Sequence, residues 1–323
     1  MKEFAYHRAT RVDEALSLQG EGTKFLGGGT NLVDLMKQGV ETPSRLVDVR
    51  FLPLAGVRAE ADGSVVIGAT TTNSDVAADP TVRRRFPALS QAILAGASGQ
   101  LRNMATVGGN LLQRTRCAYF ADPSQPCNKR LPGSGCPAVA GEHHNDAVLD
   151  WSEHCVATNP SDMAVALAAF DAVVHYETPD GPAEVPLSQF YLPVSDAPHR
   201  ETTLPPGALI TAVSLPPQGM TLSRYRKVRE RASYAFATVS VAAGLDLRDG
   251  IVHDVRIALG GVASRPWRAY SAEELLRGGP LGRVRLAAER EMEAAKPLRD
   301  NGYKVTLAVN LIEAVLTELG ERQ

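Results

Sequence analysis

The sequence predicts an α+β protein in two parts, an N-terminal region that alternates strands with helices and a C-terminal antiparallel sheet that carries helices. Three observations support this prediction. Strand and helix periods of apolar residues alternate over the first fifty residues. Pro216 and Pro217 then interrupt the chain after a strand pattern. Three further strand patterns with short turns, and then three helical patterns, follow these prolines.

The composition is that of a folded chain and excludes several classes of protein. Of 323 residues, 44% are hydrophobic and 22% are charged, which argues against a disordered or fibrous chain. The net charge of −2 gives no general reason to expect nucleic acid or an anionic membrane as a partner. No apolar stretch reaches the roughly 18 residues that span a bilayer, and the first residues lack the apolar part of a targeting signal. We therefore expect no membrane span and no signal on this chain.

The N-terminal part is predicted to be a βαβαβ unit with short parallel strands. Its strands are expected at residues 3–8, 24–26 and 45–49, and its helices at 12–19 and 30–38. In the middle region we expect strands at 65–71, 172–178 and 209–215, and helices from 73 or 74 to 78, at 86–97 and at 161–169. The C-terminal part is predicted to be a three-stranded antiparallel sheet with strands at 223–230, 237–247 and 252–260 and helices at 271–276, 283–295 and 303–318.

The first glycine cluster, Gly27 to Gly29, lies between a predicted strand and a predicted helix. Glycines let a ligand approach the backbone closely and leave N–H groups free to bind oxygens. The positive N-terminal end of a helix that begins near Thr30 suits a pyrophosphate. The cluster matches neither G-x-G-x-x-G nor the P-loop pattern, which argues against a Rossmann site and a P-loop NTPase. A structural turn before a helix would also explain one or two of these glycines.

A second glycine pair, Gly108 and Gly109, is flanked by Thr106 and Asn110, which supply polar side chains. Further along, Asp162 opens a predicted helix, where an aspartate is more often a simple N-cap than a ligand contact. Residues 225–231 carry four cations in seven residues, which suits either a solvated strand or a patch that faces phosphate.

The cysteines are the most informative residues, because all four lie between residues 117 and 155. Three interpretations of these cysteines are possible: two disulfides, a structural zinc site and an iron–sulfur cluster. A chain of this size does not need disulfides to hold a core. Zinc sites usually show close C-x₂₋₄-C pairs, whereas the gaps here are nine, eight and eighteen residues. A cluster takes four thiolates from a wrapping loop, and cations nearby favour thiolates. Such cations are present at Arg114, Arg116, Lys129 and Arg130.

In this order, the segments resemble the FAD-binding subunits of the molybdenum hydroxylases, the xanthine dehydrogenase family, over essentially the whole chain. The matching segments are 27–31 (GGGTN), 105–110 (ATVGGN), 161–162 (SD) and 225–227 (YRK). Most members lack cysteines in the region that corresponds to the insertion at 113–158. Together with residues 96–103 and 110–117, this insertion is most similar to the [4Fe–4S]-carrying flavin subunits of the bacterial periplasmic aldehyde oxidoreductases.

The resemblance implies a two-subdomain FAD-binding domain of the PCMH or vanillyl-alcohol-oxidase type. Residues 1–55 would form subdomain 1, and residues 56–218 would form subdomain 2 with a cluster-binding insertion at 113–158. Residues 219–323 would form the C-terminal α+β domain.

The resemblance also implies ligands for two cofactors on this chain. The FAD diphosphate and neighbouring atoms would be held by Phe25, Leu26, Gly27, Gly28, Gly29, Thr30, Asn31 and Leu32. A second flavin loop would contain Thr106, Gly109, Asn110 and Leu112. Asp162 would bind the ribose or adenosine end, and Ile210 and Lys227 would lie near the isoalloxazine. The [4Fe–4S] ligands would be Cys117, Cys127, Cys136 and Cys155. No residue of this chain is implied in substrate oxidation.

The implied role is electron transfer within a heterotrimer. A large partner would carry the molybdenum cofactor and oxidise an aldehyde, and a small partner would carry [2Fe–2S] clusters. FAD would pass the electrons to O₂, ferredoxin or a quinone rather than to NAD⁺. The complex would be periplasmic if a partner carries an export signal, and cytoplasmic otherwise. The alternatives are the FAD subunit of another molybdenum hydroxylase with an aromatic or CoA-thioester substrate, a free-standing flavoprotein, and a metal-stabilised (zinc) scaffold subunit without electron transfer.

Overall fold

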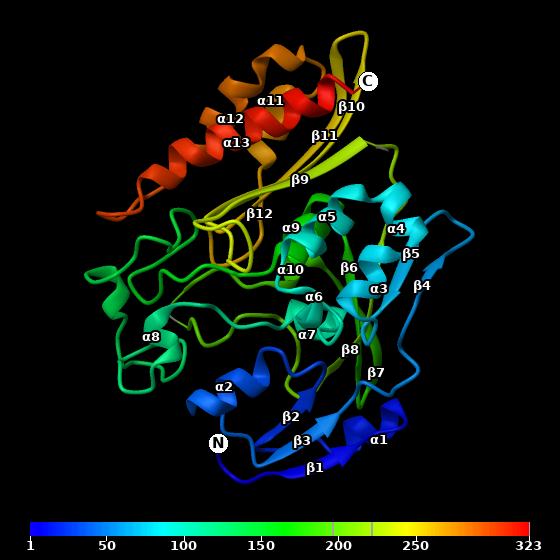
Figure 1. Cartoon of the computed structure of the whole chain (residues 1–323), viewed down its shortest axis with the longest axis vertical. Coiled ribbons are helices and arrows are strands. Elements are labelled where there is room, and N and C mark those ends of the chain that lie inside the picture. The colour runs from blue at the N-terminus through cyan, green and yellow to red at the C-terminus, as the bar shows by residue number, and fades with distance from the viewer. Residues whose placement is uncertain (196, 221, 323) are drawn as a thin grey trace.

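Three β-sheets, each formed by a separate stretch of the chain, organise the computed structural model, which describes residues 1–195, 197–220 and 222–322. The N-terminal sheet lies at one end of the molecule and the C-terminal helices lie at the other (Figure 1). The middle sheet and its helices separate them, so the three parts follow one another in space as they do in sequence.

The N-terminal unit is the parallel βαβαβ arrangement that the sequence predicts. Strands β1 (Ala5–Arg8) and β2 (Thr23–Leu26) both pair in parallel with β3 (Arg45–Asp48), which lies between them. Helices α1 (Val12–Ser17) and α2 (Leu32–Gln38) make the two crossovers. A small apolar core around Val47 also includes Leu209 of the middle unit, which fixes the two units against each other.

The middle unit contains a five-stranded antiparallel sheet. Its strand order is β4 (Val57–Ala59), β5 (Val65–Gly68), β8 (Leu209–Leu215), β6 (Val173–Thr178) and β7 (Gly181–Pro186). The sequence predicts the three inner strands, but it does not reveal β4 and β7. Both are edge strands: β4 has only three residues, and β7 contains Pro182 and Pro186, which are tolerated at an edge but weaken a strand pattern.

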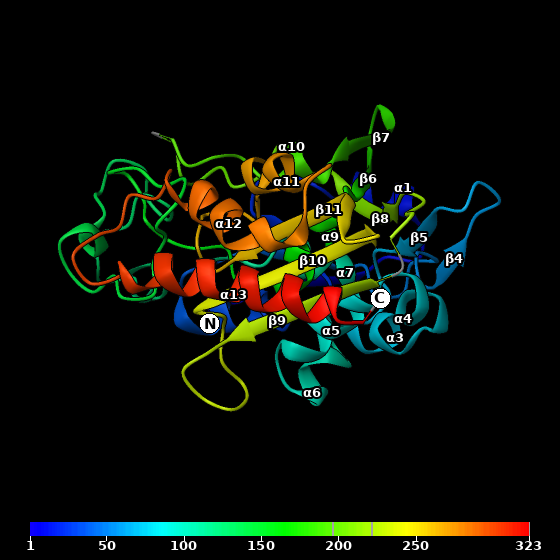
Figure 2. The same ribbon diagram turned by 90° about the horizontal axis from the view of Figure 1, so that it is seen from above.

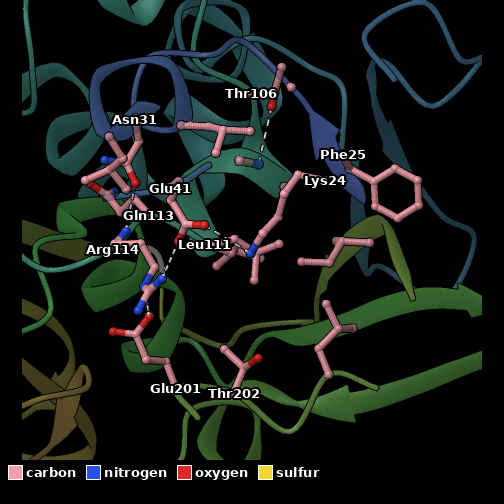
Figure 3. Close-up of a pocket in the computed structure, with 18 of the residues that line it drawn as sticks. Lys24, Phe25, Asn31, Glu41, Thr106, Leu111, Gln113, Arg114, Glu201 and Thr202 are labelled. Carbon is pink, nitrogen blue, oxygen red and sulfur yellow. Dashed lines mark hydrogen bonds and ion pairs between the residues drawn. The ribbon is translucent and has the colours of Figure 1, made fainter. Parts of the chain in front are cut away.

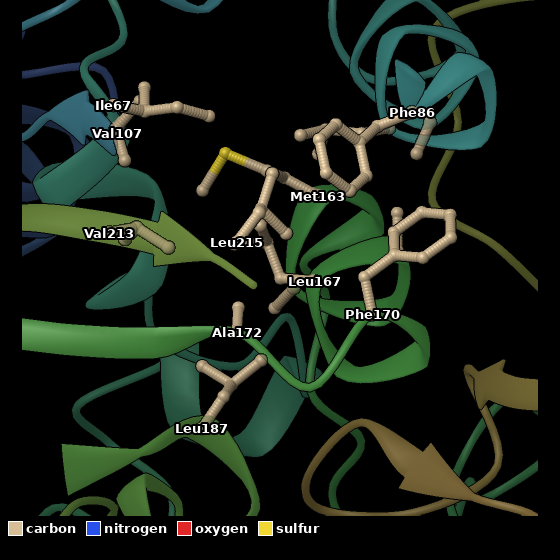
Figure 4. Packing of buried hydrophobic residues seen from close by; sticks show 14 of the residues in the cluster. Ile67, Phe86, Val107, Met163, Leu167, Phe170, Ala172, Leu187, Val213 and Leu215 are labelled. Atoms are coloured by element: carbon tan, nitrogen blue, oxygen red, sulfur yellow. The ribbon is translucent and has the colours of Figure 1, made fainter. Parts of the chain in front are cut away.

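Helices cover the middle sheet and complete its core. They are α3 (Asn73–Ala78), α4 (Pro80–Arg85), α5 (Pro87–Ala95), α6 (Gly99–Arg102), α7 (Val107–Leu111), α9 (Asp162–Ala169) and α10 (Leu187–Phe190). Met163 and Leu167 of α9 are buried in this core, and the rings of Phe86 and Phe170 meet edge to face at 5.3 Å (Figure 4). The same core includes Tyr225 of the C-terminal unit. Helix α9 is therefore packed between the middle unit and the C-terminal sheet.

The C-terminal unit is a four-stranded antiparallel sheet covered on one face by helices (Figure 2). Its strand order is β12 (Trp267–Arg268), β11 (Ile251–Gly260), β10 (Val239–Arg248) and β9 (Leu222–Val228). The helices are α11 (Tyr270–Leu276), the 3₁₀ turn η2 (Leu281–Arg283), α12 (Val284–Met292) and α13 (Tyr303–Gly320). The sequence predicts only three strands here, which is wrong: it misses β12, because a two-residue strand is too short to show an alternating pattern.

The insertion at 113–158 lies at one side of the molecule and has little regular structure. Its described helical turns are α8 (Ala118–Ala121) and η1 (Pro137–Val139). Phe120 and Cys127 pack against Leu35 of α2, whereas Val148 and Leu149 are buried in the C-terminal core. The insertion therefore connects the N-terminal unit to the C-terminal unit. Among the helices of the described ranges, none combines the length and apolar character that a bilayer span requires.

Candidate functional site

Two clefts meet at the glycine loop between β2 and α2. The first cleft, of about 770 Å³, lies between the N-terminal and middle units. The second cleft, of about 650 Å³, lies between helices of the middle unit and the segment that joins β9 to β10. Both volumes are within the range of about 300–1,000 Å³ that is usual for small-molecule sites. Thr30, Asn31 and Gly109 line both clefts, so an extended ligand that passes them can occupy both.

Glycine is required where the two glycine loops approach each other. A Cβ atom on Gly28 would lie 1.8 Å from the carbonyl oxygen of Met104, and one on Gly27 would lie 2.7 Å from Thr106 Oγ1. Thr106 caps α7, since its Oγ1 accepts a hydrogen bond from the N–H of Gly109 at 3.3 Å. The loops therefore present backbone rather than side chains at the junction of the clefts, which suits a pyrophosphate.

Buried polar atoms without a partner among the described residues occur in the walls of these clefts. Gln19 Nε2, Asn31 Nδ2 and Thr70 Oγ1 belong to residues that line the first cleft, and Asn73 Oδ1 belongs to one that lines the second. Buried polar groups are normally hydrogen-bonded, so these atoms fit the hydroxyl and phosphate groups of a dinucleotide. Of these four residues, only Asn31 is a candidate ligand from the sequence, because a single Gln, Thr or Asn outside a motif carries no pattern.

Asp162 and Lys227 form a buried ion pair in the second cleft. Ser161 Oγ, not Asp162, caps α9 by accepting a hydrogen bond from the N–H of Ala164 at 2.9 Å. The carboxylate of Asp162 is thus free to accept hydrogen bonds from Lys227 Nζ at 2.8 Å and from Tyr225 Oη at 2.5 Å. Burial and the neighbouring Asp162 raise the pKa of Tyr225 well above its ordinary value, so the phenol keeps the proton that it donates.

This contact bears on the roles that the resemblance implies for the two residues, and those roles stay predictions. Asp162 is expected at the ribose or adenosine end of FAD and Lys227 near the isoalloxazine, and the structure brings the two side chains into direct contact. Ile210, expected beside Lys227, lines the first cleft instead. The physical reason is that α9 packs against the C-terminal sheet, which brings Lys227 of β9 to the start of that helix.

The remaining predicted FAD residues gather around the clefts with one exception. The first cleft is lined by Phe25, Gly27, Gly28, Gly29, Thr30, Asn31, Leu32, Thr106, Gly109, Leu112 and Ile210. The second is lined by Thr30, Asn31, Gly109, Asn110, Asp162 and Lys227. Leu26 lines neither, and its backbone oxygen accepts a hydrogen bond from the N–H of Val49. Direct contact of these residues with FAD stays a prediction.

The four cysteines line one small cavity inside the insertion, and no disulfide links them. Burial raises the pKa of Cys117 to about 12 and that of Cys155 to about 11. Within the described residues, no three His, Cys, Asp or Glu side chains stand close enough to hold one metal ion. Four thiols on one cavity nevertheless match the ligands of a four-thiolate cluster in kind and number. Ligation by these cysteines stays a prediction.

Comparisons with known proteins identify the family to which the chain belongs. Residues 2–218 match the family model of the FAD binding domain in molybdopterin dehydrogenase, and residues 223–319 match that of the CO dehydrogenase flavoprotein C-terminal domain. The aldehyde oxidoreductase FAD-binding subunit of Escherichia coli (strain K12) is 50% identical over 321 residues, which cover 98% of both chains. The chain belongs to the FAD-binding subunits of the molybdenum hydroxylases. It is therefore an oxidoreductase subunit, as the motifs predict.

More distantly similar proteins share the whole fold of this FAD-binding subunit. The carbon monoxide dehydrogenase medium chain of Hydrogenophaga pseudoflava is 27% identical over 325 residues, or 97% of this chain and 96% of that one. A solved structure of that enzyme has a TM-score of 0.78 at 26% identity and covers 99% of this chain and 98% of its own. Quinoline 2-oxidoreductase from Pseudomonas putida 86, at 23% identity and a TM-score of 0.76 with 99% of each chain covered, shares the fold. The relatives are named as subunits and medium chains, which agrees with a multi-subunit complex.

Proposed function

We propose that this subunit holds FAD across the two clefts of a molybdenum-dependent aldehyde oxidoreductase and passes electrons from a [2Fe–2S] partner to an external acceptor. The observation that carries the proposal is the junction of the clefts at two glycine loops, with the buried Asp162–Lys227 pair on one side. Bound FAD would supply the chemistry, since it accepts electrons singly and releases them in pairs.

The residues around the junction divide the dinucleotide into two halves. The backbone of residues 27–30 and the start of α7 would hold the diphosphate, and unpaired Asn31 Nδ2 would donate to it. The second cleft would take the flavin ring, because the buried Lys227 Nζ there compensates the carboxylate of Asp162, which alone would disfavour a more anionic, reduced ring. The first cleft, with Phe25, Leu111 and Tyr191 on its wall, would then take the adenosine half.

We also propose that the four cysteines hold the [4Fe–4S] cluster. Cys117 lines both the cysteine cavity and the second cleft, so the cluster would lie beside the proposed flavin ring. Buried thiols with raised pKa values must lose their protons to bind iron, and Lys129 near Cys155 favours that loss. This position suits either an electron outlet or a structural brace.

The proposed complex is a heterotrimer with a large molybdenum-cofactor subunit and a small [2Fe–2S] subunit. Support for an aldehyde as substrate comes from the 50% identity to an aldehyde oxidoreductase subunit. The substrate would be oxidised on the large partner, and O₂, ferredoxin or a quinone would take the electrons. We further propose a periplasmic location, reached by co-export with a partner that carries the signal.

An absorption spectrum of the complex purified with its partners, together with FAD, iron and molybdenum analysis, tests this function. We expect flavin and iron–sulfur absorption with one FAD bound per copy of this chain. A colourless subunit that contains zinc would support a scaffold instead. Aldehyde oxidation by this chain alone would support a free-standing flavoprotein. Either result would overturn the proposal.

A further inference from the structure

Five charged side chains of alternating sign form a continuous chain along the wall of the first cleft. Figure 3 labels four of them, Lys24, Glu41, Arg114 and Glu201. Lys24 Nζ lies 3.5 Å from Glu41 Oε2, and Arg114 Nη1 lies 2.7 Å from Glu41 Oε1. Arg114 Nε then lies 2.5 Å from Glu201 Oε2, and Lys129 Nζ lies 2.7 Å from Glu201 Oε1. Each inner residue of this ion chain is thus held between two charges of opposite sign.

The ion chain joins segments that are far apart in sequence. Lys24 belongs to β2 and Glu41 follows α2, whereas Arg114 and Lys129 belong to the insertion and Glu201 lies between α10 and β8. Lys129 is two residues from Cys127, and it lines both the cysteine cavity and the first cleft. The loop that carries the cysteines is therefore fastened directly to the proposed dinucleotide site.

Arg114 makes two further contacts that place it at the centre of this connection. Its backbone N–H donates to Asn31 Oδ1 at 2.8 Å, and Asn31 follows the glycine loop. Its guanidinium lies 4.8 Å from the centre of the Phe120 ring, which packs against α2. A shift of the insertion would therefore move Asn31 and the glycine loop as well.

Burial makes the ion chain costly to break at one point. The exposed fraction of the side chain is 6% for Lys129 and 21% for Arg114. Removing one member of a buried pair leaves the other charge uncompensated, which costs more than the pair itself contributes. The surrounding loops therefore prefer the one arrangement in which Glu41, Arg114, Glu201 and Lys129 are all paired. Lys24, at the outer end of the ion chain, is 51% exposed and adds little.

We infer that Arg114 and Glu201 are positioning residues that couple the cysteine loop to the first cleft, so that filling the cysteine cavity and retaining the dinucleotide stabilise each other. The coupling rests on the proposed function, because it requires both FAD and a thiolate-bound group on this chain. Coupling between two sites is reciprocal, so each group must hold the other by the same factor.

The test measures the dissociation constant of FAD in the purified complex for Glu201→Gln, Cys127→Ser and the double variant. We expect each single change to weaken FAD binding about tenfold. The double variant should bind FAD about as tightly as the single variant with the lower FAD affinity, because both changes break the same link. Removal of FAD should also speed the loss of iron to a chelator in the unmodified complex but not in Glu201→Gln.

Asp254→Asn is a matched control, since Asp254 also bridges two arginines, at 3.2 Å to Arg256 and 3.0 Å to Arg277, and lines neither cleft. It should leave FAD affinity unchanged. If Glu201→Gln does not fold, Arg114→Lys keeps the charge while losing one of the two contacts, and the same cycle applies. Effects that multiply in the double variant, or an unchanged FAD affinity in Cys127→Ser, would overturn the coupling. A complex without FAD or iron would overturn the proposed function itself.

Discussion

Lys227 Nζ lies 2.8 Å from Asp162 Oδ2, and only 3% and 9% of the two side chains are exposed. The pair is neutral as a whole, so Lys227→Met leaves an uncompensated carboxylate beside the proposed flavin ring. Negative charge there disfavours the reduced flavin. Each 1.4 kcal/mol by which the reduced flavin is destabilised lowers its two-electron potential by about 30 mV. We expect the flavin potential of Lys227→Met to be about 30–60 mV lower in a spectroelectrochemical titration of the complex.

The double variant Lys227→Met with Asp162→Asn removes both charges and serves as the control for this measurement. Its flavin potential should return toward that of the unmodified complex, because the second cleft is neutral again. An unchanged potential in the single variant would show that the flavin ring does not lie in the second cleft.

Gly28→Ala should damage the junction of the clefts. The new Cβ would lie 1.8 Å from the carbonyl oxygen of Met104. Both the glycine loop and the segment at Met104 meet there through backbone, so neither can move without separating the two loops. We expect a loss of about 3 kcal/mol in the free energy of unfolding, at the upper end of overpacking effects, together with weaker FAD binding. Urea denaturation and FAD titration measure the two effects.

Gly20→Ala is the matched control for Gly28→Ala. Gly20 lines the first cleft too, but a Cβ atom there meets nothing within 4 Å. Its unfolding free energy and FAD affinity should stay close to those of the unmodified chain. Equal losses in the two variants would mean that the close approach of the loops is not what requires glycine.

Cys127→Ser should remove four irons per copy of this chain and abolish the EPR signal of the cluster, while FAD stays partly bound. A serine hydroxyl is a poor substitute for a thiolate, and a cubane needs all four ligands that this cavity offers. Iron analysis and EPR of the complex measure the loss. Ser124→Ala, an exposed position of the same insertion, should keep the iron. Unchanged iron in Cys127→Ser would refute the ligand assignment.

The parts of the fold that follow from the sequence are those in which local pattern and tertiary packing agree. The N-terminal βαβαβ unit alternates strand and helix periods, and α1, β2 and β3 contribute residues to one apolar core. Strands β4, β7 and β12 depend on neighbours that are distant in sequence, because each is short or rich in proline. Their pairing partners, not their own residues, make them strands.

The candidate site shows the same division between local and tertiary information. Glycine loops have a local signal, so residues 27–29 and 108–109 could be found from the sequence. The contact of Asp162 with Lys227 could not, since 65 positions separate them and only the packing of α9 on the C-terminal sheet joins them. The ion chain through Arg114 and Glu201 is equally invisible, because each member alone is an ordinary charged residue in a loop.

Asp48 gives a prediction about acid stability in the N-terminal unit. It is fully buried and accepts hydrogen bonds from Arg50 Nη2 at 2.8 Å and Tyr6 Oη at 2.6 Å. Burial pushes the pKa of Asp48 upward, but these hydrogen bonds outweigh it and hold the pKa below the ordinary value of 3.8.

Because the pKa of Asp48 is lower in the folded chain, the unfolded chain binds the proton more readily. The stabilisation is therefore present above the ordinary pKa and is lost as the pH falls through the lowered one. Asp48→Asn should cost about 2 kcal/mol at pH 7, the usual contribution of hydrogen bonds to a charged group, and progressively less below pH 4 in urea denaturation. Tyr6→Phe, which removes one of the hydrogen bonds, should show a smaller loss with the same dependence, whereas a loss that does not change with pH would show that Asp48 is not ionised in the folded chain.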